Sequence, residues 1–302
     1  MPLVRRSSQG MIIMPQLVQI IFSWDRPLQL WGLVRSMLDN TDLKPQQIQA
    51  LCKCSRTEYR KLYQTTGKEL GCQIVYQGNR SLWDLTWAQV QNNEFVSLVV
   101  DDMVFFRKAS YNNAIKIMQE KPEICLWSWS IGSDLWTLDK ALLHKRHWTA
   151  PWAVGFPYNY IFHTNGSLYR KKDFEYWMQL ITKHCRAKFN LNHIEGYLSM
   201  IFKSAGQQLG SLHAGPLLQA CTTWRVNKIS NPRKKSGYYE IAQTKPNYLK
   251  GVFERGGRLD YSPLYERVDW LRKLNKNQTN FAHIVGSKEA TDFFMTLIGY
   301  PG

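Results

Sequence analysis

The chain has 302 residues, of which 44% are hydrophobic and 13% aromatic, a composition that excludes a disordered protein and indicates a globular one with a sizeable core. Its 39 lysine and arginine residues against 23 acidic residues give a net charge of +16, which favours an anionic partner: nucleic acid, an anionic membrane face or a phosphorylated small molecule. A nucleic-acid module is disfavoured, because the sequence has no zinc-finger spacing, basic zipper or RNA-recognition signature.

In the first half of the chain, predicted strands alternate with predicted helices. Residues 16–22 form an almost unbroken apolar run, which is typical of a buried strand of a parallel sheet. Residues 28–38 follow Pro27 with apolar positions at three- and four-residue spacing, which predicts a helix. Further strands are expected at residues 47–54, 73–76, 95–100 and 124–129, and further helices at residues 58–65, 82–91 and 111–120. This alternation predicts an open, mostly parallel sheet with helices on both faces, which binds ligands at the carboxyl ends of its strands.

The second half of the chain is less regular. Residues 150–160 are rich in proline and aromatic residues and are expected to form a loop, whereas residues 172–185 and 195–203 have helical patterns. From about residue 229 the pattern weakens into basic and glycine-rich stretches between shorter helices. No internal repeat and no clear linker is found, so we expect one compact domain with a C-terminal extension.

The cysteines and the lengths of the apolar runs indicate in which cellular compartment the protein works. None of the six cysteines has the spacing of a metal site, and four lie among apolar neighbours, as expected of free thiols in a reduced compartment. The first ten residues contain no apolar run long enough for a signal peptide, and no later segment approaches a membrane span. These features predict a cytoplasmic protein.

Two adjacent carboxylates, Asp101 and Asp102, follow the predicted strand at residues 95–100. Like charges side by side repel, and desolvation at the end of a buried strand adds to the cost. A divalent cation relieves both penalties, since Mg²⁺ or Mn²⁺ takes one or two carboxylates and fills its shell with phosphate oxygens and water. The alternative interpretation is that both aspartates cap the turn after the strand or the next helix.

With its first strand and helix and this pair of aspartates, the chain resembles GT-A glycosyltransferases of the family-2-like group. Members begin with a strand, a polar turn and a helix, here residues 20–30, and carry an aspartate-rich motif at the end of a central strand, here residues 100–103. The strict motif is Asp-x-Asp, whereas this chain has adjacent aspartates. Weaker matches to bacterial members lie at residues 165–170, 192–196 and 226–228, and the resemblance covers roughly residues 15–230.

The resemblance implies an α/β fold of the GT-A, Rossmann-like type, with a mixed, mostly parallel sheet. It divides the chain into an N-terminal tail (residues 1–14) and a glycosyltransferase domain (residues 15–230), followed by an extension packed on the same domain (residues 231–302). Within the domain, residues 15–130 would bind the nucleotide sugar and residues 131–230 the acceptor.

The resemblance also implies roles at the donor site. Asp102 would bind the Mn²⁺ or Mg²⁺ that bridges the two phosphates of the donor, and Asp101 would face the ribose or sugar. His213 lies where some members supply a further metal ligand. Asp25 could hydrogen-bond the base or ribose, or could instead cap the helix after it, and Arg26 is a candidate phosphate or base contact.

Inverting transfer needs a base that takes the proton of the acceptor hydroxyl. Glu195, at the start of the predicted helix at residues 195–203, is our first candidate, with Asp173 and Asp134 in reserve; the alternative is a glutamate that merely favours the helix dipole. Arg170 begins a basic run that could neutralise the diphosphate or could simply be a solvated face. Seven tryptophan and tyrosine residues crowd the stretch from residue 127 to residue 160, which indicates an acceptor cleft.

The predicted activity is therefore metal-assisted transfer of a sugar from a nucleotide-diphosphate donor to a hydroxyl of a glycan or glycolipid, with inversion. The net charge would suit a cytoplasmic enzyme working at the inner face of an anionic membrane. Two alternatives stay open. A nucleotidyltransferase would use a similar sheet but usually has a glycine-rich loop after the first strand, where residues 23–27 lack glycine; a basic binding protein for nucleic acid or an anionic surface would tolerate loss of Asp101 and Asp102.

Overall fold

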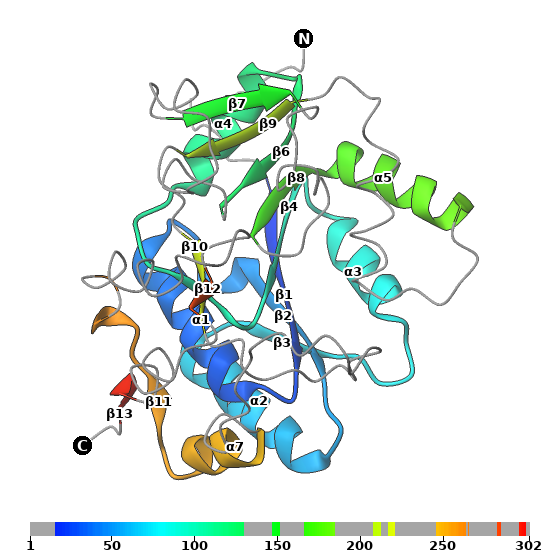
Figure 1. Ribbon diagram of the computed structural model, residues 1–302. Helices are drawn as coiled ribbons and strands as arrows, with labels where there is room; N and C mark the ends of the chain where they lie inside the picture. The colour runs from blue at the N-terminus through cyan, green and yellow to red at the C-terminus, as the bar shows by residue number, and fades with distance from the viewer. Residues whose placement is uncertain are drawn as a thin grey trace, which may run out of the picture.

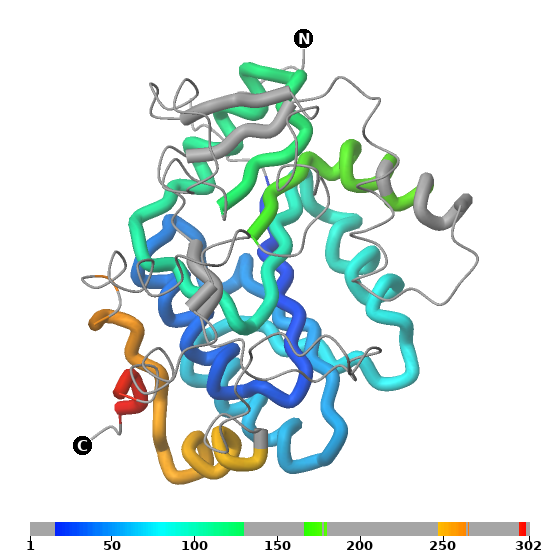
Figure 2. Tube along the Cα trace, in the orientation of Figure 1, coloured from blue at the N-terminus to red at the C-terminus, as the bar shows by residue number. Residues whose placement is uncertain are grey.

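The computed structural model describes nine parts of the chain: residues 16–129, 147–151, 166–184, 208–212, 217–220, 246–263, 265, 283–284 and 296–299. Figure 2 traces the path of the backbone. Among the helices in these parts, none combines the length and the apolar character needed to cross a membrane.

The first half of the chain follows the predicted alternation of strands and helices. Helix and strand bounds differ from the expected ones by a few residues, and a short strand, β5, directly follows the two aspartates. The elements are β1 (Leu17–Trp24), α1 (Pro27–Asn40), a 3₁₀ turn (Pro45–Gln47), β2 (Ile48–Lys53), α2 (Thr57–Leu70), β3 (Gln73–Tyr76), α3 (Leu82–Val90), β4 (Phe95–Val100), β5 (Met103–Phe105), α4 (Tyr111–Glu120) and β6 (Ile124–Ser128).

The second half contributes short strands that the sequence pattern did not reveal. The described elements are β7 (His147–Pro151), β8 (Ser167–Arg170), α5 (Lys171–His184), β9 (Gln208–Leu212), β10 (Leu217–Ala220), α7 (Pro246–Glu254), β11 (Arg258–Leu259), β12 (His283–Ile284) and β13 (Ile298–Gly299). The helix expected at residues 172–185 is α5. The prediction of a loop at residues 150–160 is wrong for residues 150 and 151, which pair with β9 and form the end of β7. Residues 152–160 and the helix expected at residues 195–203 lie outside the described residues.

An eight-stranded sheet organises the fold, in the order β3-β2-β1-β4-β8-β6-β9-β7 (Figure 1). Four neighbouring pairs are parallel (β3-β2, β2-β1, β1-β4 and β6-β9), and three are antiparallel (β4-β8, β8-β6 and β9-β7). The prediction of a mixed, mostly parallel α/β sheet is thus confirmed. Two small sheets, β12-β10-β5 and β11-β13, complete the described strands.

One face of the sheet is covered by α1, α2 and α4. Because side chains alternate along a strand, Leu17 and Ile21 of β1 point to the same face. They belong to one buried apolar cluster with Leu30 of α1, Tyr63 of α2 and Met118 of α4. This cluster is the main core of the described structure.

Helices α3 and α5 cover the opposite face, to the right of β1 and β4 in Figure 1. Val96 of β4 pairs with Tyr169 of β8, so both side chains point to this face. The ring of Phe174 in α5 lies 5.9 Å from the ring of Tyr169 and 5.9 Å from the ring of Trp83 in α3. Both faces are therefore buried, as the apolar runs in β1 and β4 require.

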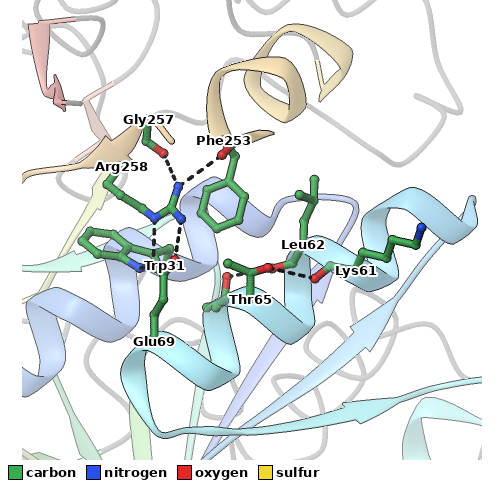
Figure 3. Close-up of polar contacts among 9 residues, drawn as sticks. Trp31, Lys61, Leu62, Thr65, Glu69, Phe253, Gly257 and Arg258 are labelled. Carbon is green, nitrogen blue, oxygen red and sulfur yellow. Dashed lines mark hydrogen bonds and ion pairs between the residues drawn. The ribbon is translucent and has the colours of Figure 1, made fainter. Parts of the chain in front are cut away.

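Helix α7 and strand β11 of the C-terminal region pack on α1 and α2. A second apolar cluster joins Leu28 of α1 to Val252 and Phe253 of α7. Arg258 donates hydrogen bonds to Glu69 of α2 at 2.6 and 2.9 Å and to the carbonyl oxygens of Phe253 and Gly257 (Figure 3). This clamp holds the start of β11 against the two helices.

Candidate functional site

The candidate site lies where the strand order of the sheet reverses. From β1 the chain runs to β2 and β3 on one side, whereas β4 lies on the other side of β1 and leads to β6, β8 and β9. In open α/β sheets, the crevice at the carboxyl ends of two such strands is where ligands bind. The parallel pairing sets Phe22 opposite Val100, so the residues after β1 and the residues after β4 emerge side by side.

Four of the residues predicted from the sequence meet at this position. Asp25 and Arg26 follow β1, and Asp101 and Asp102 follow β4. All three carboxylates are buried, with exposed fractions of 7% for Asp25, 2% for Asp101 and 7% for Asp102. Charges buried to this extent need partners, and the structure supplies them within the site.

A closed ring of hydrogen bonds holds Asp101. The backbone N–H of Arg26 donates to the hydroxyl oxygen of Tyr63 at 2.8 Å, and that hydroxyl lies 2.6 Å from Oγ of Ser23. Because the hydroxyl of Ser23 donates its one proton to Oδ2 of Asp101 at 2.6 Å, it accepts from the hydroxyl of Tyr63. The guanidinium of Arg26 donates to Oδ1 of Asp101 at 2.9 Å and so closes the ring.

Arg26 also joins the two aspartates to each other. Its Nη1 lies 2.9 Å from Oδ1 of Asp101 and 3.4 Å from Oδ2 of Asp102, and the exposed fractions of the three side chains are 14%, 3% and 10%. The guanidinium therefore balances one of the two adjacent negative charges. Asp101 accepts hydrogen bonds on both oxygens from within the protein, which makes it the residue that positions Arg26.

Asp25 does not cap α1, the second of its two sequence-based interpretations. Its backbone has a φ of 55°, a left-handed conformation that aspartate adopts more readily than most side chains. Its Oδ1 accepts a hydrogen bond from the backbone N–H of Ser55 at 2.8 Å, and its own N–H donates to the carbonyl of Lys53. The capping interpretation is wrong, because Arg26 occupies the N-cap position of α1 and Asp25 ties the loop after β1 to the loop after β2.

Burial shifts the protonation of this cluster. Desolvation raises the pKa of Asp101 to about 6, although the charge of Arg26 acts in the opposite direction. Desolvation lowers the pKa of Arg26, but the negative charges of Asp101 and Asp102 outweigh it and leave the pKa above its ordinary value. Burial likewise raises the pKa of Tyr63, which keeps its hydroxyl protonated and able to donate.

The segment after Asp102 is fixed by α1. The hydroxyl of Ser36 accepts a hydrogen bond from the backbone N–H of Phe105 at 3.0 Å, and the amide of Asn40 donates to the carbonyl of Phe105 at 2.9 Å. Alternate side chains of β5 enter different clusters: Met103 lies in the main core, whereas Val104 packs with the C-terminal region. Strand β5, which directly follows the aspartate pair, is therefore fixed by these two hydrogen bonds and by packing in both apolar clusters.

Arg170, predicted to contact the donor, lies at the opposite end of the sheet. Strand β8 is antiparallel to β4, so Arg170 pairs with Phe95 at the amino end of β4 rather than with the carboxyl end. Its guanidinium donates to the carbonyl oxygens of Met118, Lys121 and Pro122 at 2.7–3.1 Å, which lie in the last turn of α4 and directly after it. It also pairs with the reserve base Asp173 at 2.5 Å. The structure thus does not bring Arg170 or Asp173 to the crevice.

The remaining predicted residues divide into two groups. Glu195, His213 and Asp134 lie outside the described residues. Of the aromatic residues assigned to an acceptor cleft, Trp127 and Trp129 are fully buried, and their rings lie 6.1 Å apart in the main core. For these two residues the acceptor-cleft prediction is wrong, because β6 is an interior strand.

A divalent cation at this site would be held by few protein ligands. Within the parts of the chain that the structure describes, no group of three or more histidine, cysteine, aspartate or glutamate residues gathers around a common point. Both oxygens of Asp101 accept from Ser23 and Arg26, and the carboxylate of Asp102 lies next to them in the chain. One carboxylate is sufficient for Mg²⁺ or Mn²⁺ when phosphate oxygens and water supply the other ligands.

Sequence analysis missed two residues of this site, Ser23 and Tyr63. Ser23 lies in the polar break after the first strand and could have been noted there. Tyr63 is forty positions from Ser23, in the middle of α2, and carries no local signal. Only the packing of α2 against β1 shows that its hydroxyl reaches the site.

No protein-family profile matches the chain, and no curated protein matches it. Similar folds are found among solved structures. One is S. aureus TarS 1–349 in complex with UDP, which is 11% identical to this chain with a TM-score of 0.45. The match covers 66% of this chain and 58% of the TarS chain. A mannosyltransferase from Pyrobaculum calidifontis in complex with GDP-Man and Mn²⁺ is 12% identical with a TM-score of 0.40. That match covers 65% of this chain and 54% of the mannosyltransferase chain. A cytidylyltransferase from Leptospira borgpetersenii is 11% identical with a TM-score of 0.42 and covers 88% and 98%.

Glycosyltransferases, which the sequence motifs resemble, are thus among the structural neighbours, together with a nucleotidyltransferase. The first two of these matches extend over little more than half of the matched proteins. Likenesses of this degree do not assign an activity, so function is inferred from the residues of the crevice.

Proposed function

We propose that the protein is a glycosyltransferase that transfers a sugar from a nucleotide-diphosphate donor, and that the donor binds at the carboxyl ends of β1 and β4. The observation that carries this proposal is the meeting of Arg26, Asp101 and Asp102 at the carboxyl ends of β1 and β4, where the strand order reverses. A guanidinium held beside a carboxylate that can take a cation is what a diphosphate requires.

Helix α1 adds to the attraction for an anion. It runs for 14 residues from Pro27, so its positive end lies directly beside Arg26. The N-cap carries no side-chain hydrogen bond, and no acidic residue lies in the first turn of the helix. The amino end of α1 and the guanidinium of Arg26 would therefore act together on phosphate oxygens.

Asp102 is the residue that we propose to hold the divalent cation, Mn²⁺ or Mg²⁺. When bound, such an ion would stabilise the negative charge that develops on the departing diphosphate. Asp101 would act by positioning Arg26, since its oxygens are engaged by Ser23 and Arg26. Asp25, whose Oδ1 is bonded to Ser55, would offer its second oxygen to the ribose or base.

The acceptor side of the reaction is proposed from the sequence. Glu195 would take the proton of the acceptor hydroxyl in an inverting transfer, and His213 would add a ligand to the cation. The acceptor would be a glycan or glycolipid, and the net charge of +16 would favour contact with an anionic membrane at its cytoplasmic face.

The test is a thermal-shift panel of UDP, GDP, dTDP, ADP and CMP, with and without Mn²⁺, on the full-length chain. A ligand present at 100 times its Kd should stabilise the protein by about 2.7 kcal/mol. We expect one diphosphate to give this shift only with Mn²⁺, and Asp102→Asn to abolish it. Asp39→Asn is the matched control, because Asp39 forms an exposed ion pair with Arg35 on α1.

Sugar release from the matching nucleotide sugar then identifies the reaction. Release of free sugar and nucleoside diphosphate supports a glycosyltransferase, whereas release of pyrophosphate from a nucleoside triphosphate would identify a nucleotidyltransferase. If no nucleotide shifts the wild type and Asp102→Asn is indistinguishable from it, the donor site is refuted.

A further inference from the structure

We propose that Arg26 is a built-in counter-ion that keeps a divalent cation off the aspartate pair until a nucleoside diphosphate arrives. The inference rests on the proposed donor site and adds how that site is regulated: metal and nucleotide enter together rather than metal first. Arg26 would thereby couple the two binding events.

The charges of the described cluster carry the inference. Asp101 and Asp102 contribute two negative charges, and Arg26 contributes one positive charge within 2.9 and 3.4 Å of their oxygens. The cluster thus has a net charge of about −1. A divalent cation bound to it alone would leave an excess of positive charge among side chains that are at most 14% exposed.

Arg26 cannot readily leave this position. Its backbone N–H is bonded to Tyr63, and its Nη1 is bonded to Asp101, which Ser23 holds from the other side. The guanidinium therefore stays beside Asp102 when a cation binds there. Repulsion between a unit positive charge and a divalent cation a few ångströms apart weakens binding by more than about tenfold in a partly desolvated site.

A nucleoside diphosphate removes this conflict. Its negative charges offset the excess positive charge, and its oxygens give the guanidinium a second anion to pair with. The affinity of the protein for the cation should therefore rise steeply when a diphosphate is present, and by linkage the cation should raise the affinity for the diphosphate by the same factor.

The experiment measures Mn²⁺ binding to the full-length chain by the loss of the free-ion electron paramagnetic resonance signal, first with Mn²⁺ alone and then with UDP, GDP, dTDP or ADP. Wild type is compared with Arg26→Gln. Arg35→Gln is the matched control, since Arg35 also pairs with an aspartate but on the exposed face of α1. Arg26→Gln leaves two buried carboxylates without their guanidinium, which can destabilise the fold. A second comparison therefore sets Asp101→Asn against the double variant Arg26→Gln/Asp101→Asn, in which both partners of the ion pair are neutral.

We expect Arg26→Gln to bind Mn²⁺ alone about tenfold more tightly than wild type, or better, and the double variant to exceed Asp101→Asn similarly. The gain that the diphosphate adds should shrink in both. Arg35→Gln should match wild type. An unchanged or weaker affinity for Mn²⁺ alone in both comparisons would overturn the counter-ion role. Absence of any diphosphate binding would instead refute the donor site, while the measurements with Mn²⁺ alone would still decide what Arg26 does.

Discussion

Replacing Tyr63 by phenylalanine tests whether the hydrogen-bonded ring organises the candidate site. The hydroxyl of Tyr63 is the only part of the side chain that the change removes, so packing in the main core is kept. Two contacts disappear: the bond accepted from the backbone N–H of Arg26 at 2.8 Å and the bond to Ser23 at 2.6 Å.

The cost follows from the burial of the groups left behind. A buried donor that loses its partner costs about 1–3 kcal/mol, and the N–H of Arg26 loses the hydroxyl that accepts its proton. We expect Tyr63→Phe to lower the free energy of unfolding by about 2 kcal/mol, or the midpoint of thermal unfolding by roughly 4–8 °C. Because Ser23 keeps its bond to Asp101 but loses its bond to Tyr63, Asp101 and Arg26 should be held less firmly, and the affinity for the diphosphate should fall several-fold.

Urea unfolding followed by tryptophan fluorescence measures the first effect, and titration with the diphosphate in the presence of Mn²⁺ measures the second. The matched control is Tyr76→Phe, because the hydroxyl of Tyr76 donates to the carbonyl of Arg60 at 2.8 Å on the exposed surface. Its loss should cost less than about 0.5 kcal/mol and leave binding unchanged. Equal stability and equal affinity in Tyr63→Phe and wild type would refute the view that the ring supports the site.

Three further predictions concern residues away from the crevice. A Cβ at Gly32 would lie 2.7 Å from the ring of Tyr261, so Gly32→Ala should destabilise by about 1 kcal/mol in urea, even though alanine favours the helix by a similar amount; a stabilised variant would contradict this contact. Hydrogen bonds from Arg258 lower the pKa of Glu69, so the stability difference between wild type and Glu69→Gln should be present above pH of about 4.3 and vanish as the pH falls through the lowered pKa; a difference that persists at pH 2 in urea titrations would count against the clamp. Arg170→Gln should destabilise by about 1–3 kcal/mol without changing diphosphate affinity, and a parallel loss of affinity would return Arg170 to the donor site.

The local features of the site could be predicted from the sequence. The apolar runs at β1 and β4 identify buried strands because both faces of such a strand are covered, and the polar residues that follow each run emerge at the same edge of a parallel sheet. The sequence pattern therefore identified four candidate site residues: Asp25, Arg26, Asp101 and Asp102. Each is specified by its position relative to one strand end.

The strands of the second half escaped prediction for the opposite reason. β8 has four residues, and so few cannot make an alternation pattern stand out from a loop; the same holds for the three residues of β5 in the first half. Their extended form depends on a partner: β8 pairs with β4 and β6, and β5 pairs with β10. Arg170 illustrates the consequence, since the antiparallel direction of β8 places it at the end of the sheet away from the aspartates.

The sequence by itself thus determined the class of sheet, the edge where we propose that the donor binds and the carboxylates that follow the strands there, because these follow from periodicity within single segments. Only the tertiary structure decided which charges meet. The 2.9 Å contact between Arg26 and Asp101 joins residues 75 positions apart, and Tyr63 of α2 reaches Ser23 of β1. Contacts of this kind depend on how elements pack across the sheet, and that packing is a property of all segments together.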